Sequence, residues 1–412
     1  MFYVSVCAPK NEMQKAPARV STMSASWAIG LIIGGPIGSA FSERVTWRWA
    51  FLLNLPCAGA TIILAYFCVP ETRFLPDEND SILRRPRRLD WAPILLNIAM
   101  PVLFALALTF SGSVWHWDSR PVLGVWLSFG LVSLLWVLYL WSNVEWSGLL
   151  LHTRTQLSMW ALLAGSACAG ASYAISLYFF PLYFAFAKGA DALEQTLWVL
   201  PFVFAFIASV AATGRLLHIA GFYRAIYAAG GAILVAAGVA LTVVLTPETP
   251  RAQVAGLEAL VGIGVGLLFQ HSIGICNALE RSKDKRKRLD SIFMCNFAQM
   301  GGIPMTLAAS WGIFQNVGYR LLAQSLGSTL NEIQIRQLLA GSSTNTQNGA
   351  LLRKGADIVC IVIAREFYIV AAAGGVSVMV GLLFLVCTWS EKIDFSNPVE
   401  AGESVEVVEN TS

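Results

Sequence analysis

Long apolar runs alternate along the chain with short segments that contain charged residues, glycine or proline. A helix that crosses a membrane needs about 20 mostly apolar residues, and runs of that length recur throughout the sequence. The pattern therefore predicts an all-α polytopic membrane protein with about ten membrane-spanning helices. We expect these helices at residues 23–41, 47–69, 91–110, 121–141, 157–186, 192–213, 223–245, 252–278, 290–317 and 364–389.

Polar segments divide the expected helices. Segment 1–22 precedes the first helix, 70–90 forms a basic loop, and 390–412 forms an acidic tail without ordered structure. A longer segment, 319–363, separates the last two expected helices. Its leucine and isoleucine residues have mixed helical spacing, so we expect either a short interfacial helix or a loosely packed outer loop.

The positions of lysine and arginine predict the orientation in the membrane. With a cytosolic N-terminus, the inner segments receive most basic residues, including the clusters at 84–88 and 281–288. The short outer loops then receive few. Because basic residues are retained on the cytosolic side, we expect a multi-pass protein with both termini in the cytosol.

Composition supports a lipid bilayer as the main partner and excludes several functions. Hydrophobic residues make up 56% of the chain and charged residues 13%, against roughly 25% charged residues in soluble domains. The formal net charge of +3 is too small to indicate nucleic-acid binding. The eight cysteines and four histidines are dispersed, so we expect no metal site, no cofactor and no enzyme activity. The sequence has no glycine-rich phosphate loop, which argues against an ATP-driven pump.

The first apolar run carries a stripe of glycines. Gly30, Gly34 and Gly38 recur at every fourth position, so on a helix they leave one face without side chains, which a neighbouring backbone can approach closely. Gly35 and Pro36 lie within the same run, and the proline weakens the hydrogen-bond ladder and favours a bend. The stripe serves either a conformational switch or static packing.

The second run opens with aromatic residues around an arginine. Trp47, Arg48 and Trp49 stand at the mouth of the expected helix, followed by Asn54 and Pro56. Arg48 is either a functional charge or an anchor at the membrane interface, where aromatic and basic residues gather.

Few ionisable or strongly polar residues fall inside the expected spans, where they are costly and often functional. Glu258 is the one carboxylate that we place well inside a span. It is therefore the candidate protonatable group, the alternative being a helix-end carboxylate that reaches the outer interface. A histidine side chain ordinarily titrates near neutral pH, and His271 lies next to Gln270 in the sequence. We expect either a role for them in a cavity or hydrogen-bonded packing.

Further side chains have the character of cavity or gate residues. Asn296 and Gln299 share a helix face next to a Gly-Gly-x-Pro break, so they either line a polar cavity or bond to a neighbouring helix. Tyr173 and Tyr178 either line an aromatic pocket for a flat organic substrate or belong to the core or the lipid-facing surface. The tight cytosolic turn after the sixth helix is flanked by Arg215 and Arg224, which either lock an inner gate or serve as basic anchors.

Several of these motifs resemble the fungal fourteen-helix drug:proton antiporter branch of the major facilitator superfamily. The glycine-proline run is similar to its antiporter motif, and the Trp47–Pro56 segment is similar to the WRWxFxINLP opening of its next helix. The sequence departs from the family's antiporter motif where Gly35 separates Gly34 from Pro36 and where Ser39 follows Gly38. Further likenesses are Trp115-His116-Trp117-Asp118, Phe180-Pro181-Leu182-Tyr183-Phe184, Lys188-Gly189, Leu200-Pro201, Gly214-Arg215 and Gly221-Phe222-Tyr223-Arg224.

This resemblance implies the major facilitator fold. Aligned by these motifs, 23–69 corresponds to the last two helices of an incomplete first bundle, 91–141 to two extra central helices, and 157–389 to a complete second bundle of six helices. The first four helices of the family pattern are then missing from this chain.

The resemblance also implies a function: efflux of a small organic molecule, such as a drug, toxin or secondary metabolite, across the plasma membrane. Proton entry would drive export by alternating access. The alternative is a truncated, non-transporting remnant, or a membrane subunit that needs a partner chain.

Overall fold

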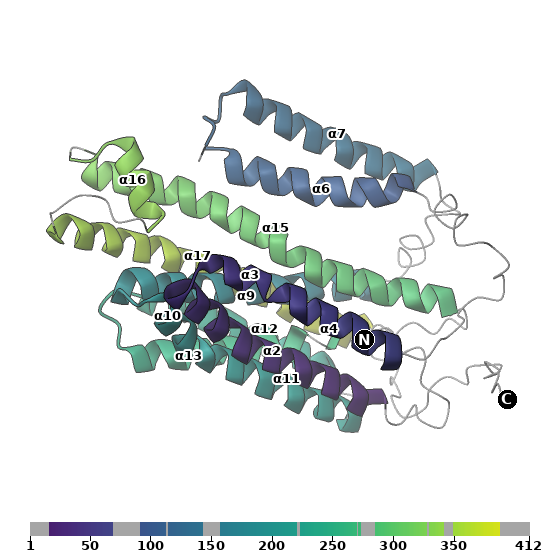
Figure 1. Ribbon diagram of the computed structural model, residues 1–412. Helices are drawn as coiled ribbons and strands as arrows, with labels where there is room; N and C mark the ends of the chain where they lie inside the picture. Colours follow the sequence, from purple (N-terminus) through teal and green to yellow (C-terminus); the bar gives the residue numbers. More distant parts are fainter. Residues whose placement is uncertain are drawn as a thin grey trace.

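The computed structural model describes residues 16–68, 91–112, 114–142, 157–220, 223–269, 271–272, 285–327, 329–341 and 349–387. In this part of the chain every regular element is an α-helix (Figure 1). The helices are α2 (Ala16–Arg44), α3 (Trp47–Leu52), α4 (Asn54–Cys68), α6 (Trp91–Phe110), α7 (Arg120–Ser142), α9 (Leu157–Lys188), α10 (Ala192–Trp198), α11 (Leu200–Ala220), α12 (Tyr223–Val244), α13 (Arg251–Phe269), α15 (Lys285–Leu326), α16 (Glu332–Leu339) and α17 (Gly349–Cys387).

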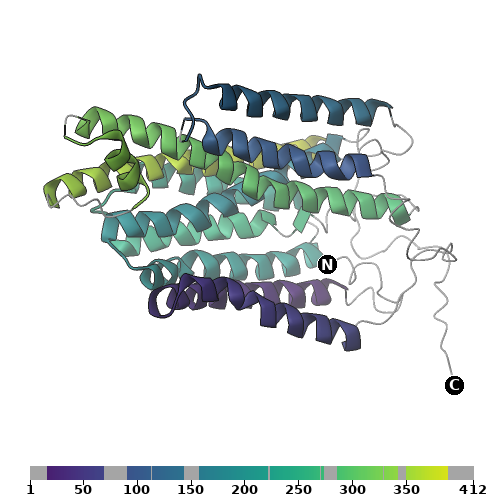
Figure 2. The same cartoon turned by 45° about the horizontal axis from the view of Figure 1, so that its top comes forward.

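The expected membrane character is confirmed. Among the described residues, seven helical stretches are long and apolar enough to cross a membrane. They are Trp47–Cys68, Arg120–Tyr139, Leu157–Lys188, Ala192–Gly214, Arg224–Val244, Arg251–Phe269 and Arg353–Phe384. The long helices α2, α6 and α15 lie alongside them, so each of the ten expected spans corresponds to a helix or a helix pair (Figure 2).

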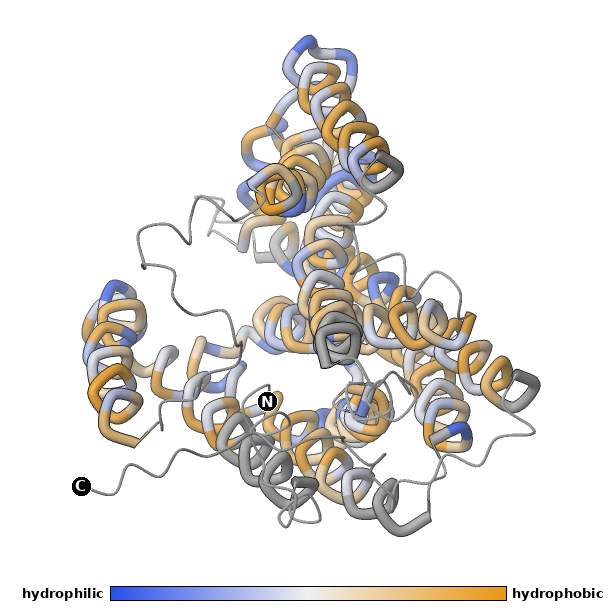
Figure 3. The backbone as a smooth tube through the Cα atoms, turned by 90° about the vertical axis from the view of Figure 1, so that its right-hand side faces the viewer, coloured by the Kyte–Doolittle hydropathy of each residue, from blue (hydrophilic) through white to orange (hydrophobic). Residues whose placement is uncertain are grey.

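Helices α9 to α17 form one packed bundle, and two smaller groups flank it. The α6–α7 hairpin packs against α15, whereas α2 packs against α10 and α11 (Figure 1). Seen end on, the two groups lie on different sides of the bundle, and apolar residues predominate along the helices (Figure 3). The bundle therefore supplies the frame on which both groups rest.

Small residues bring α12 and α17 into backbone contact. A Cβ atom built at Gly238 would lie 2.7 Å from the backbone nitrogen of Ala371, and one built at Gly374 would lie 2.7 Å from that of Val235. Inside a membrane, van der Waals packing of this kind holds helices together. These two helices therefore act as one stiff layer of the bundle.

Two expected spans contain a break near one end. The α10–α11 span breaks at Val199, because Pro201 has no N–H to donate to the carbonyl of Leu197, four residues earlier. The Trp47–Cys68 span likewise divides at Leu53 into α3 and α4. Both breaks lie at the same end of the molecule, which we call the α10 end (Figure 1).

The expected long outer loop, 319–363, is largely helical. Helix α15 continues to Leu326, α16 follows, and α17 begins at Gly349 rather than at residue 364. The buried side chains of α16, Ile335, Leu338 and Leu339, pack onto the bundle. Of the two alternatives, a helix has formed, and it rests on protein rather than lying loose.

Parts of the remaining expectations fall outside the described residues. These are segment 1–15, the basic loop 70–90, residues 281–284 of the cluster at 281–288, Gln270, the turn 221–222 and the tail 390–412. The side chain of Arg215 is also outside them.

Candidate functional site

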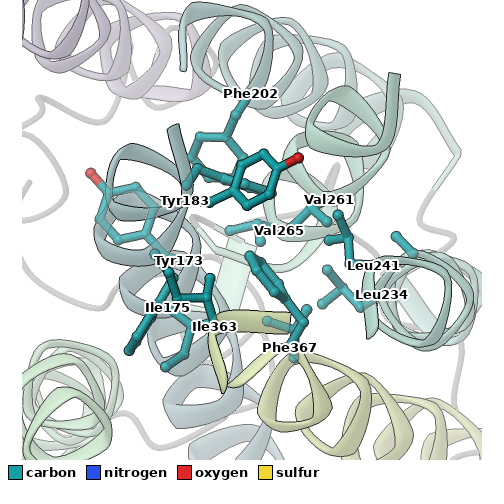
Figure 4. Close-up of a cluster of buried hydrophobic side chains, with 14 of the residues drawn as sticks. Tyr173, Ile175, Tyr183, Phe202, Leu234, Leu241, Val261, Val265, Ile363 and Phe367 are labelled. Atoms are coloured by element: carbon teal, nitrogen blue, oxygen red, sulfur yellow. The ribbon is translucent and has the colours of Figure 1, made fainter. Parts of the chain in front are cut away.

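Aromatic and aliphatic side chains fill the centre of the bundle. Figure 4 shows side chains from α9, α11, α12, α13 and α17 meeting there. The ring of Tyr173 lies 4.9 Å from that of Phe269 and 5.6 Å from that of Phe206, centroid to centroid. Tyr173 therefore packs in the core, and it retains only 7% of its accessible surface.

Tyr178 occupies a different face of α9. Its side chain is 41% exposed, and its ring stands edge-on to Trp311 of α15 at 6.2 Å. Trp311 in turn stacks on the buried Phe314. Tyr173 therefore belongs to the core, whereas Tyr178 lies exposed beside Trp311.

The structure separates Asn296 from Gln299. Gln299 is buried, and its Nε2 donates to the carbonyl oxygen of Phe269, so it joins α15 to the end of α13. Asn296, about 60° away around α15, is exposed. Sequence spacing placed both on one face, but the width of a helix face leaves one side chain inside and one outside.

His271 follows α13 and is buried. Its Nε2 has no hydrogen-bond partner among the described residues, and the neighbouring Ser272 pairs with the Tyr227 hydroxyl of α12 at 2.7 Å. The histidine thus sits at a junction of α12 and α13, next to a satisfied polar pair.

Glu258 lies fully inside the bundle. Its side chain has no exposed surface, and neither carboxylate oxygen has a hydrogen-bond partner among the described residues. Arg251, two turns earlier in α13, places its guanidinium over the Trp198 ring at 4.1 Å. The alternative that Glu258 reaches the outer interface is therefore wrong for this structure.

A second buried carboxylate, Glu366 of α17, was missed in the sequence. It is 2% exposed, and its Oε2 accepts a hydrogen bond from the hydroxyl of Ser310 on α15 at 2.5 Å. Its Oε1 is buried without a partner in the described part of the chain. Because α17 begins at Gly349, this residue lies well inside a helix and not at its first turn. The motif AREFYIV within the apolar run is the signal that would have found it.

Helix α2 meets the bundle through a small-residue face. A Cβ built at Gly35 would lie 2.5 Å from the Thr196 Cγ2 atom, and the hydroxyls of Ser39 and Thr196 share a hydrogen bond at 2.5 Å. One turn further, the Glu43 carboxylate accepts from the Leu193 amide at 2.8 Å. This contact joins the first part of the chain to α10.

The expected glycine stripe is not the one in contact. Gly30, Gly34 and Gly38 have no atom of the described residues outside their own helix within 4 Å of a Cβ built at any of them. The contact through Gly35 and Ser39 takes its place, because the partner helix lies on the adjacent side of α2. Pro36 lies between the two stripes, half-buried.

The basic candidates lie at helix ends. Arg48 stacks its guanidinium over the Trp47 ring at 5.5 Å, and Trp47, Trp49, Asn54 and Pro56 are all exposed. Arg224 stands half-buried in the first turn of α12, and Arg215 belongs to the last part of α11.

In the described segments, no group of three or more His, Cys, Asp or Glu side chains is arranged to hold a metal ion.

Comparison with known proteins places these features in a family. The chain is 26% identical over 402 residues to a transporter of the phomenoic acid biosynthesis cluster of Leptosphaeria maculans, covering 90% of this chain and 62% of that protein. It is 27% identical to the efflux pump patC of Aspergillus clavatus, covering 90% of this chain and 68% of that protein. It is 28% identical to the efflux pump DEP3 of Fusarium langsethiae, covering 94% and 69%.

The chain thus spans roughly two thirds of the length of these relatives. The model of the Major Facilitator Superfamily matches residues 11–303, which is more than half of the chain. This is a family of membrane transporters and not of enzymes, in keeping with the helices of membrane-spanning length. The protein is therefore a multi-pass membrane protein that belongs to the Major Facilitator Superfamily.

Proposed function

We propose that this protein exports small organic molecules, such as a drug, toxin or secondary metabolite, by proton antiport and alternating access. The family match supports export, and so do the names of two of the relatives described above, which are efflux pumps. The roles that follow are assigned within this proposal.

The observation that carries the proposal is the contrast between two kinds of helix contact. Inside the bundle, α12 and α17 touch backbone to backbone, and the aromatic core is tightly packed. The α2–α10 contact instead rests on Gly35, Ser39 and Glu43. Alternating access needs one stiff body that rocks against another across a contact that opens. The glycine-lined helix α2 supplies that contact.

Within this proposal, the substrate contacts those predicted cavity residues that are exposed. Tyr178 and Asn296 are exposed on α9 and α15, so they are free to touch a weakly polar, aromatic molecule. Tyr173 and Gln299 support them from inside the bundle. Flat apolar ligands favour such aromatic surfaces with a few polar groups.

The proton side uses carboxylates buried in the bundle. Ionisable groups inside membrane proteins mark proton pathways, and Glu258 has the burial that this role requires.

We place both termini in the cytosol of a plasma-membrane protein, on the basis of the basic inner segments. Arg215 and Arg224 then stand at the inner gate, with Arg48 as an interface anchor.

Proteoliposomes provide the test. The full chain is reconstituted into vesicles with an imposed pH gradient, and accumulation of rhodamine 6G, a planar aromatic dye, is followed by fluorescence quenching. We expect accumulation that depends on the gradient and stops when a protonophore is added. Vesicles without protein provide the control.

A second candidate function is a non-transporting chain or a membrane subunit that needs a partner. It is favoured by the Trp47–Cys68 span, which buries none of its residues against the described protein. Absence of dye accumulation by the chain alone, with accumulation restored by a co-purified partner, would identify this function instead.

A further inference from the structure

The pair formed by Ser310 and Glu366 has no role in the packing described above. Both side chains are buried, and their hydrogen bond connects α15 to α17. The next residue, Phe367, packs its ring on Phe180 of α9 at 4.9 Å. Phe180 precedes Lys188 at the α10 end by eight residues, or about 12 Å along a helix. The carboxyl group thus lies inside the bundle and away from that end.

On the helices that pack against α17, three side chains have partners other than Glu366. Lys188 of α9 donates to the carbonyl oxygen of Pro247, and Arg336 of α16 pairs with Glu332. Tyr227 of α12 pairs with Ser272. On α17 itself, Arg365 and Tyr368 are exposed. Among the described residues, Ser310 supplies the one hydrogen bond that Glu366 makes.

Helix α15 has a weak point between its anchored part and Ser310. A Cβ built at Gly302 would lie 2.7 Å from the carbonyl oxygen of Ala167, which fixes this turn against α9. Pro304 follows and cannot donate a hydrogen bond to the carbonyl of Met300, so the ladder is interrupted there. Proline with adjacent glycine is the usual cause of a helix kink. A change of bend at this point would move Ser310 relative to α17.

We propose that Ser310 and Glu366 form a proton-binding site whose occupancy is coupled to the bend of α15. This inference rests on the proposed proton antiport and adds Glu366 to Glu258 as a second buried carboxyl group that binds a proton. A proton from water binds a carboxylate oxygen of Glu366, forming one O–H bond, and the group becomes neutral. The group holds this proton while α15 is bent and the Ser310 hydroxyl is withdrawn. When the hydroxyl returns and donates to Oε2, it favours the carboxylate, so the proton leaves to water on the other side and the carboxylate is restored.

The first test is infrared difference spectroscopy of the whole protein between acidic and alkaline pH. We expect a protonated-carboxyl band that Glu366→Gln removes. Ser310→Ala should shift the frequency of this band, because the serine hydroxyl hydrogen-bonds to that carboxyl. Matched controls are Glu248→Gln, an exposed loop carboxylate, and Ser377→Ala, a buried serine that bonds within its own helix. A band unchanged by Glu366→Gln, or unmoved by Ser310→Ala, overturns the proposal, and the milder serine variant keeps the test open if Glu366→Gln does not fold.

The second test uses proteoliposomes and rhodamine 6G. Glu366→Gln should lower gradient-driven accumulation by about 10-fold or more, while exchange of dye at equal pH on both sides persists, because only net proton movement needs the carboxyl. Full gradient-driven accumulation by this variant contradicts the site. If the infrared band behaves as expected but the wild-type chain moves no dye, the proton site stands and the proposed export function fails.

Discussion

The indole Nε1 of Trp117 donates a hydrogen bond of 3.2 Å to the side-chain oxygen of Asn316, joining the α6–α7 turn to α15. The amide nitrogen of Asn316 donates to the carbonyl of Ser111, at 3.3 Å, in the same turn. Arg336 of α16 donates to the next carbonyl, that of Gly112, at 3.2 Å. These three bonds hold the α6–α7 hairpin to the bundle, so we expect the hairpin to move with it.

Gly112 is the first test of this joint. Its φ of +80° lies in the left-handed region, and a side chain there would collide with Asn316. Gly112→Ala should lower the free energy of unfolding by about 1–3 kcal/mol. Gly124→Ala in α7 is the matched control, because open space surrounds it, and alanine there should be neutral or stabilising by up to about 1 kcal/mol. Unfolding in detergent measures both; equal behaviour of the two variants would contradict the joint.

Arg336 is the second test. Its guanidinium bonds to Glu332 at 2.9 Å and to the Gly112 carbonyl, and it lies 4.8 Å from the centroid of the Tyr319 ring. Lysine lacks the planar fork that makes these contacts together. We therefore expect Arg336→Lys to lose most of what Arg336→Ala loses, about 1–2 kcal/mol of unfolding free energy. Arg320→Ala, an exposed arginine on α15, serves as the control and should change little. A lysine variant as stable as the wild type would show that charge alone suffices.

The apolar runs predict nearly all of the helices, because a bilayer imposes length and composition on each span. Where the apolar runs fail to predict a helix, the reason lies in the residues of that segment. Arg353, Lys354 and Asp357 make the start of α17 polar, so that part reads as a loop, although it is helical and its Cys360 is buried. For the same reason the pattern predicts Glu366 at a helix edge, where a buried carboxylate is not expected.

Sequence spacing also cannot tell which side of a helix meets its partner. Two small-residue stripes run along α2, and the regular one, with three glycines, is the exposed one. The contact of Gly35 with Thr196 depends on the break before Leu200, which sets α10 at its position beside α2. Tertiary placement of this kind is absent from the spacing of any single run.

Substitutions on the two stripes of α2 should therefore differ in effect. Gly35→Leu places a side chain against Thr196 and should separate α2 from α10, whereas Gly34→Leu points into open space. We expect the first to destabilise the protein by about 1–3 kcal/mol and the second by less than about 1 kcal/mol. Unfolding in detergent compares them, with both variants purified under the same conditions. Greater damage from Gly34→Leu would restore the regular glycine stripe as the contact face.

Two engineered disulfides test which helix contact opens during transport and which one stays closed. A Cβ at Gly35 would lie 3.9 Å from the Thr196 Cβ, and a Cβ at Gly312 would lie 3.8 Å from the Leu108 Cβ. Both separations suit a disulfide. The pair Gly35→Cys with Thr196→Cys would lock α2 to α10, and Gly312→Cys with Leu108→Cys would lock α6 to α15. The exposed Cys57 and Cys68 are replaced by serine in both.

Oxidation should inhibit dye transport in the first protein and leave it nearly unchanged in the second. Locking α2 to α10 should reduce rhodamine 6G accumulation by about 10-fold or more, with recovery on reduction, because rocking of the bundle needs that contact to open. Locking α6 to α15 should change the rate by less than about 2-fold, because these helices belong to one body. Each protein in its reduced state is its own control, which separates the effect of the bond from that of the substitutions. Inhibition by the α6–α15 bond alone would mean that the central hairpin, and not α2, moves against the bundle.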